Sequence, residues 1–562
     1  MKRSKTETIQ ITATFRGRSA LLIAMVTVAF VFSSIPSAYA QKKTKRPHTS
    51  GSRSLSTSTW LTTDAKNALD AAVAALQADS LSEAERKARE ASRLAPRSPV
   101  AHNVLGVVLD KAGKTKEAFS AFQTAVRLDA KFISPRNNLA RLLAQTGKTA
   151  EAIVQFENLL KIEPTYLQAQ YNLGALYAET GNFEKAAGSF AAARRSAPND
   201  PQLALAFLNV AYRAKLQAEA DAAADLVEQT AQNDFRGLFM LGIALAQNNQ
   251  YERASRIFLK TNELQPKSFE VLYNLGVSLY NLDKNDEAIK YLAEAADLKP
   301  EAPEIHFRLG LAASDKNDFT NAAEEFRHAV ERDPKNANYN YLLGREYFRS
   351  GFFEGAIDAY TKAIALNPKE VAYVMARANA NYRKGEGQPS ALDFDRAAEL
   401  DPNIKDIDYL RGYAHRSAGN FERARELLEK FVAKNSNHVE ALASLGYIAV
   451  EQGRLTEAEP ILKKVLQLDP ENTAALYDFA RLAVKQRNYD EGVRRLEIVV
   501  NKDKLHTQAY YQLFLAYSRL KSTDNAQKAL ADFKRLETLE KRSQEEKLLD
   551  EKLRTQQILR RQ

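Results

Sequence analysis

Residues that could carry out catalysis or bind a metal are few and widely separated in this chain of 562 residues. The sequence has no cysteine, and it contains no HExxH, P-loop or GxSxG motif. No histidine has a second histidine at the spacing of a metal-ligand pair. The seven are His48, His102, His306, His328, His415, His438 and His506. The sequence therefore predicts a protein that is not an enzyme and has no catalytic, metal or cofactor site.

Aromatic residues, in contrast, recur at a fixed interval. Tyrosine or phenylalanine takes the same place, counted in steps of 34 residues, at Tyr171, Phe239, Tyr273, Phe307, Tyr341, Tyr409, Tyr477 and Tyr511. Aromatic rings can grip an extended ligand with a small loss of conformational entropy. The same rings can instead fill seams between packed helices. Which of these two roles applies depends on how the helices that carry the rings are packed.

Residues 167–200, LQAQYNLGALYAETGNFEKAAGSFAAARRSAPND, represent the element that carries each ring. Apolar residues recur every three or four positions in two runs, which predicts two amphipathic helices. Gly181 lies between the runs, where a left-handed residue ends a helix, and Pro198 stops the second helix. Gly174 and Ala186 have almost no side chain, so we expect the two helices to approach closely there.

The same plan returns every 34 residues from residue 65 to residue 540, which gives fourteen units. Positions are numbered within a unit, and unit 1 begins at Ala65. Small residues dominate position 8 and fill position 20 in every unit. The residues that we expect to set the helix packing are Gly106, Ala118, Gly174, Ala186, Gly276, Ala288, Gly310, Ala322, Gly344, Ala356, Gly446 and Ala458.

Unit 4 carries the signature of a known repeat family. The matching residues are Leu173, Gly174, Tyr177, Ala186, Phe190, Ala193 and Pro198, and Gln170 stands in place of the early tryptophan. The chain resembles the tetratricopeptide repeat (TPR) family over about 85% of its length. The resemblance implies an all-α fold, a right-handed TPR superhelix (α-solenoid) of about fourteen 34-residue helix-turn-helix units. It also implies that positions 2, 5, 6, 9, 12 and 13 of the first helices line a concave groove.

Three features of these positions predict that the groove binds an extended partner. Aromatic residues recur at position 5, asparagine recurs at position 6, and basic residues of units 9–14 outnumber acids at positions 9, 12 and 13, where Glu451 is the one acid. The alternative is that the arginines pair with acids on neighbouring helices. The candidate groove residues are Asn138, Tyr171, Asn172, Tyr273, Asn274, Tyr341, Arg345, Arg349, Arg383, Tyr409, Arg416, Tyr477, Arg481, Lys485 and Arg519.

Residues 1–40 are typical of a secretory signal peptide. Basic residues precede an apolar run over residues 21–32, and the small-x-small end at Ala38 and Ala40 predicts cleavage after Ala40. The alternative is an uncleaved anchor in the inner membrane, although the run is shorter than the ~20 apolar residues that span a bilayer. The expected location is the bacterial periplasm.

The net charge of +10 is concentrated before the repeats. Residues 1–60 contain ten basic side chains and one acidic side chain, or +9, so the rest of the chain is nearly neutral. This distribution argues against a nucleic-acid partner. Residues 41–64 are typical of a disordered, basic, Ser/Thr-rich linker. Within it, residues 41–59 are expected either to contact the cell envelope peripherally or to remain a solvated tether. Residues 541–562 are expected to form a polar helical cap.

Taken together, the repeats and the leader predict a protein–protein interaction scaffold of the bacterial cell envelope. An extended, acidic peptide or protein segment is the expected occupant of the groove. The alternative is a polysaccharide-export scaffold that binds an anionic glycan, because aromatic grooves also stack sugars. The sequence leaves the partner's identity and the oligomeric state open.

Overall fold

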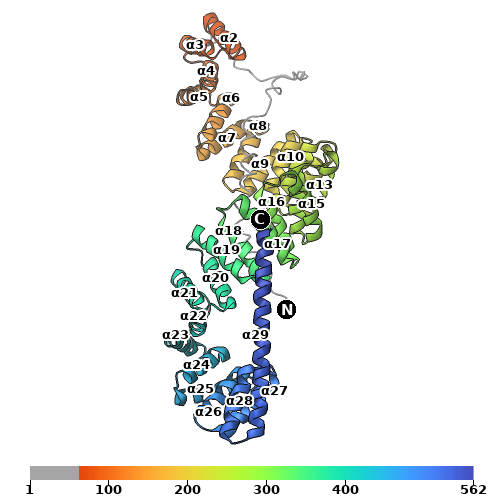
Figure 1. The fold of residues 1–562 in the computed structure, drawn as a ribbon. Helices are drawn as coiled ribbons and strands as arrows, with labels where there is room; N and C mark the ends of the chain where they lie inside the picture. Colours follow the sequence, from red (N-terminus) through yellow and green to blue (C-terminus); the bar gives the residue numbers. More distant parts are fainter. Residues whose placement is uncertain (1–61, 561–562) are drawn as a thin grey trace. The chain divides into compact units, whose positions relative to one another are not determined.

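A computed structural model describes residues 62–560 of the chain. The expected signal peptide (1–40) and nearly all of the expected linker (41–64) lie outside the described residues. The described part contains 28 α-helices and no strand (Figure 1). None of these helices combines the length and the apolar character that a bilayer span needs. The predicted all-α TPR solenoid is confirmed.

The chain divides into two compact halves, residues 1–282 and residues 283–562. The helices of the first half are α2 (Thr63–Gln77), α3 (Leu81–Leu94), α4 (Pro99–Lys111), α5 (Thr115–Leu128), α6 (Ile133–Gln145), α7 (Thr149–Ile162), α8 (Leu167–Glu179), α9 (Phe183–Ser196), α10 (Pro201–Arg213), α11 (Gln217–Thr230), α12 (Phe235–Gln247), α13 (Tyr251–Leu264) and α14 (Phe269–Asn281).

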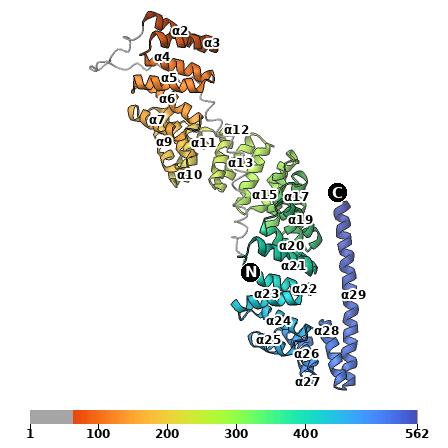
Figure 2. The same ribbon diagram turned by 90° about the vertical axis from the view of Figure 1, so that its left-hand side faces the viewer.

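The second half follows the same alternation of first and second helices (Figure 2). Its helices are α15 (Asn285–Leu298), α16 (Pro303–Asp315), α17 (Phe319–Arg332), α18 (Ala337–Arg349), α19 (Phe353–Leu366), α20 (Val371–Lys384), α21 (Gly387–Leu400), α22 (Ile407–Ser417), α23 (Phe421–Lys434), α24 (Val439–Glu451), α25 (Leu455–Leu468), α26 (Thr473–Lys485), α27 (Tyr489–Lys502), α28 (Thr507–Arg519) and α29 (Thr523–Arg560).

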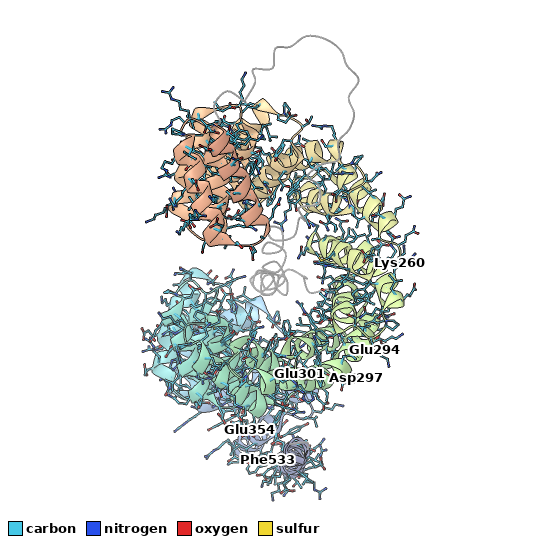
Figure 3. The ribbon with its side chains drawn as sticks, turned by 90° about the horizontal axis from the view of Figure 1, so that it is seen from above. Lys260, Glu294, Asp297, Glu301, Glu354 and Phe533 are labelled. Atoms are coloured by element: carbon cyan, nitrogen blue, oxygen red, sulfur yellow. The ribbon has the colours of Figure 1, made fainter. Side chains whose placement is uncertain are left out.

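The second helix of every unit begins at position 17, from Leu81 in unit 1 to Thr523 in unit 14. Within each half, first helices of successive units also contact one another, as α4 contacts α6 and α24 contacts α26. The first helices therefore form the closely spaced inner side of the array. Second helices form its outer side, where Lys260 of α13 lies (Figure 3) and pairs with Glu228 of α11.

The turn inside each unit has a left-handed residue at position 15. Glycine provides it in seven units, at Gly113, Gly147, Gly181, Gly351, Gly385, Gly419 and Gly453. The other seven turns have a positive φ at Asp79, Lys215, Asn249, Asp283, Asn317, Arg487 and Lys521. Lysine and arginine in this region strain the backbone, because their Cβ atoms crowd the neighbouring carbonyl.

Close packing inside a unit joins position 8 to position 24. A Cβ atom added to Gly106 would lie 2.5 Å from Cε1 of Phe122, and one added to Gly174 would lie 3.0 Å from Phe190. The alanines at position 20, such as Ala186, are buried. However, the side chain that contacts the glycine at position 8 is the one at position 24, not the alanine. The small residue at position 8 therefore accommodates a bulky side chain one turn beyond position 20.

Candidate functional site: the inner face of the first helices

The position-5 rings lie between the first and second helices and remain partly exposed. In four units the ring contacts the position-24 ring of the same unit, as Tyr171 contacts Phe190 with centroids 5.5 Å apart and Tyr341 contacts Tyr360 at 5.8 Å. Burial raises the pKa of the Tyr171 and Tyr341 hydroxyls. Seven of the eight rings are half-buried, and Tyr511 is 38% exposed. The rings thus fill seams between helices and are still partly exposed.

The three position-6 asparagines bond to different kinds of neighbour. Asn138 donates from Nδ2 to Oδ1 of Asn103, 3.1 Å away on the preceding first helix. Asn172 accepts from Nε2 of Gln168 at 3.3 Å, within its own helix. Asn274 donates to the backbone carbonyl of Glu270 at 2.7 Å, which is again a local bond. Only Asn138 among the three links two units.

A buried carboxylate organises the basic residues of unit 9. The Glu346 side chain is fully buried at position 10, which is apolar or small in most other units. Nε of Arg345 lies 2.7 Å from Oε1 of Glu346, and Nη1 of Arg349 lies 3.3 Å from Oε2. Ser314 of the preceding first helix donates to Oε1 at 3.0 Å. Two candidate groove arginines therefore neutralise one internal acid.

A second cluster alternates tyrosines and arginines along units 11–13. The Arg416 guanidinium carbon lies 4.4 Å from the Tyr413 ring centroid and 5.3 Å from that of Tyr447. The Arg481 guanidinium carbon follows at 6.0 Å from Tyr447 and 5.6 Å from Tyr477. Cations over ring faces are attracted by the ring quadrupole, so this row is held together from helix to helix.

Two acids lie beside this row. Nη2 of Arg481 lies 2.8 Å from Oε1 of Glu451, and its Nη1 lies 3.3 Å from Oδ1 of Asp478. Burial raises the pKa of Asp478 to about 6, against the opposing attraction of Arg481. Arg416 forms no ion pair in the described part of the chain, although its charge also attracts Asp478, and it donates to Oγ of Ser444 at 3.1 Å.

The remaining candidate cations contact no acid within the described residues. Arg383 lies over the Phe353 ring at 5.5 Å, and Lys485 donates to the Val450 carbonyl at 2.8 Å. Arg519 is exposed. The predicted cationic residues thus fall into two sets. Arg345, Arg349 and Arg481 pair with acids, whereas Arg383, Arg416, Lys485 and Arg519 do not.

Sequence reasoning missed a contact that joins successive units. In units 2, 3, 4 and 8 the position-4 side chain donates to the carbonyl of position 32 in the preceding unit. His102 does so at 3.0 Å to Pro96, and His306 at 3.0 Å to Pro300. Arg136 makes the same bond to Ala130 at 2.9 Å. Polar residues at position 4 were the signal, but their target becomes visible only when the units are stacked. No group of three or more potential metal ligands gathers in the part of the chain described.

Comparisons with known proteins agree with this geometry. One family model, described as Tetratricopeptide repeat, matches residues 69–131, 239–303, 273–337, 341–403 and 409–473, which is more than half of the chain. A second model of the same description matches residues 143–207 and 449–516. No curated protein matches the chain.

Several solved structures are similar at low identity. The "Crystal structure of APC/C hetero-tetramer Cut9-Hcn1" is 17% identical, with 85% of this chain and 94% of that chain covered and a TM-score of 0.33. Yeast Tom70 is 15% identical, with 76% and 96% covered and a TM-score of 0.28. MamA from Desulfovibrio magneticus RS-1 is 24% identical, with 31% and 99% covered and a TM-score of 0.29. The family models, together with the helix pairs and their 34-residue phase, place this chain in the tetratricopeptide repeat family.

Proposed function

We propose that this TPR scaffold binds an extended, acidic segment of a partner protein along the first helices of units 10–14. The observation that carries the proposal is a set of four basic side chains on these helices that form no ion pair within the described residues: Arg383, Arg416, Lys485 and Arg519. A series of positive charges along a concave wall focuses its field on a ligand of opposite charge.

The aromatic residues support an extended shape for this ligand. Tyr409, Tyr477 and Tyr511 occur on the first helices of units 11, 13 and 14, each with part of its ring exposed. Tyrosine supplies contact area with only two side-chain torsions to fix, so the cost of ordering is small. A segment that follows the array can therefore place one residue after another on rings that are already held in place.

The acid-paired arginines are excluded from the proposed contact set. Arg345 and Arg349 hold the buried Glu346, so charge reversal there would leave three negative charges together and disrupt the fold. A loss of binding in such a variant would not report on the groove.

The experiment measures the affinity of the full chain for a short, fluorescein-labelled poly-L-glutamate by fluorescence anisotropy. Reversing Arg383, Arg416, Lys485 and Arg519 to glutamate should weaken binding by about tenfold or more at low salt. The control reverses four exposed cations on second helices, Lys116→Glu, Lys362→Glu, Arg494→Glu and Lys528→Glu, so that its net charge matches that of the test variant, and it should change the affinity little. Equal loss in both variants would show that only the net charge matters and would refute the groove.

A glycan ligand is tested in the same assay. Binding of polygalacturonate but not of poly-L-glutamate, with steep dependence on salt, would replace the protein segment by an anionic polysaccharide. Binding of poly-L-glutamate alone supports the proposal.

We further propose that the protein acts in the bacterial periplasm after removal of residues 1–40, because these residues have the pattern of a signal peptide. Expression of the full gene in a Gram-negative host should give periplasmic protein whose N-terminal residue is Gln41. Retention of Met1 in the membrane fraction would instead support the uncleaved anchor.

A further inference from the structure

A buried carboxylate lies among the cations of the proposed groove. Asp478 is at position 6 of unit 13, on the first helix α26, and its side chain is only 7% exposed. Arg481 and Lys485 follow three and seven residues later, so the three side chains lie on one face of this helix. Position 6 carries an acid in one other unit, at Asp70, and that residue is exposed. The inner face of unit 13 therefore has an internal negative charge beside its positive ones.

Asp478 shares its nearest cation with a second acid. Nη1 of Arg481 lies 3.3 Å from Oδ1 of Asp478, whereas Nη2 of the same guanidinium lies 2.8 Å from Oε1 of Glu451 on α24. The buried Glu346 of unit 9 has the opposite arrangement, because two arginines and the Ser314 hydroxyl all bind that one carboxylate. The charge of Asp478 is therefore compensated less completely than that of Glu346.

Other charges act on Asp478 from the neighbouring helices. Arg416 of α22 attracts the ionised carboxylate and Glu451 repels it, but the largest influence is burial, which raises the pKa of Asp478 to about 6. The second helix α25 meets α26 through the apolar Leu462 and Val465. The remaining titratable or charged groups beside this row are Tyr447, Tyr477, Glu491, Arg495 and His506.

An acidic ligand in this groove would bring one more negative charge close to Asp478. A like charge disfavours the ionised form of a carboxylate, and it does so more strongly where burial limits screening by water. Conversely, a proton from the solvent that binds Asp478 removes a charge that repels the ligand. Proton binding and ligand binding therefore favour each other, and each must strengthen the other by the same factor.

We propose that Asp478 takes up a proton when the acidic segment binds, so that capture becomes tighter as the pH falls. This inference rests on the proposed function, because it places the acidic segment on the first helices of units 11–13. It adds a regulation of the same groove, which holds its partner more firmly in acidic surroundings and releases it as the pH rises. The change is expected between about pH 7.5, where Asp478 is mostly ionised, and about pH 5.5, where it is mostly neutral.

Isothermal titration calorimetry of the full chain with unlabelled poly-L-aspartate tests the coupling. The carboxyl groups of this polymer have a pKa of about 3.9 and stay ionised over the whole range. Titrations at pH 6.5 in buffers of different ionisation enthalpy give the number of protons taken up on binding. The unmodified chain should bind about three- to sixfold more tightly at pH 5.5 than at pH 7.5.

Asp478→Asn is the decisive variant, because an amide has nearly the same shape and cannot take up the proton. It should take up about 0.3–0.5 proton fewer than the unmodified chain at pH 6.5 and bind about three- to eightfold more tightly at pH 7.5. Any proton uptake by His506 is common to both chains, so the difference between them belongs to Asp478. Far-UV circular dichroism checks that the variant is folded.

Glu426→Gln is the matched control, since it also removes one negative charge but lies on the second helix α23 with 67% of its side chain exposed. This variant should keep both the proton uptake and the affinity of the unmodified chain. Equal proton uptake by the unmodified and Asp478→Asn chains would overturn the inference and leave the groove standing. If poly-L-aspartate bound to neither chain at any of these pH values, the groove itself would be refuted.

Discussion

Replacing Gly106 by alanine should destabilise unit 2, although alanine is the better helix former. The new Cβ would lie 2.5 Å from Cε1 and 2.6 Å from Cδ1 of Phe122, whereas carbon atoms in favourable contact lie about 3.5–4.0 Å apart. The Phe122 ring is fully buried, so it cannot move aside without shifting its helix. Overpacking of this kind costs about 1–3 kcal/mol, and the gain in helix propensity returns about 0.5–1 kcal/mol. The expected net loss is about 0–2.5 kcal/mol, with a central value of about 1 kcal/mol.

Gly188→Ala is the matched control, because it makes the same change inside a helix with nothing within 4 Å of the added Cβ. Only the propensity term applies there, so that variant should gain about 0.5–1 kcal/mol.

Hydrogen exchange followed by mass spectrometry is the suitable assay, because a repeat array opens locally and one global midpoint would average over many units. Faster exchange should be confined to α4, α5 and their neighbours in Gly106→Ala, while α9 should exchange more slowly in Gly188→Ala. If Gly106→Ala is stabilised as much as the control, the close contact between positions 8 and 24 is not present and the packing argument fails.

Three further perturbations test other parts of the structure. Lys215→Gly should slow hydrogen exchange in unit 5, because Lys215 has a left-handed backbone conformation (φ 61°) that glycine adopts without strain. The expected gain in the free energy of unfolding is about 0.5–1 kcal/mol. Unchanged exchange would mean that the turn is not strained. The folded pKa of Asp478 (about 6) exceeds its ordinary value of 3.8, so its stabilising contribution is full below pH 3.8 and is lost as pH rises through 6. That loss is roughly 2–3 kcal/mol, and Asp478→Asn should flatten the pH dependence of hydrogen-exchange protection in α26 between pH 4 and pH 7, after correction for the intrinsic exchange rates. Replacing both Arg345 and Arg349 by methionine should cost about 3 kcal/mol, because it leaves the buried charge of Glu346 without a cation. Adding Glu346→Leu to the same chain should restore most of the hydrogen-exchange protection of unit 9, whereas a triple variant as unstable as the double one would contradict the pairing.

Much of the fold follows from sequence because the signals are local and repeated. Gly181 between two amphipathic runs predicts a helical hairpin, and its turn is indeed left-handed. Lys215 and Arg487 occupy the same backbone conformation, which their own propensities would not suggest. These two turns connect helices that pack against each other within one unit, α10 with α11 and α26 with α27. That packing, and not the propensity of the turn residue, accounts for the conformation.

The candidate site was harder to predict than the fold. Repeat phase places Arg345 and Arg481 on first helices, but it does not reveal that each has an acidic partner. Glu346 could have been noticed as a charged residue at an apolar position, which is the usual sign of an internal ion pair.

The bond from position 4 to the preceding carbonyl gives the contact before units 2, 3, 4 and 8 its own chemistry. Imidazole forms it before units 2 and 8, guanidinium before unit 3 and carboxamide before unit 4. A unit moved to another place in the array would bring its own position-4 side chain and would meet the position-32 carbonyl of a different preceding unit. Units 2 and 8 could exchange places and keep a histidine bond to the preceding carbonyl. Exchange of either with unit 3 or unit 4 would replace that bond by one from arginine or glutamine. The order of the units is therefore part of what the molecule encodes.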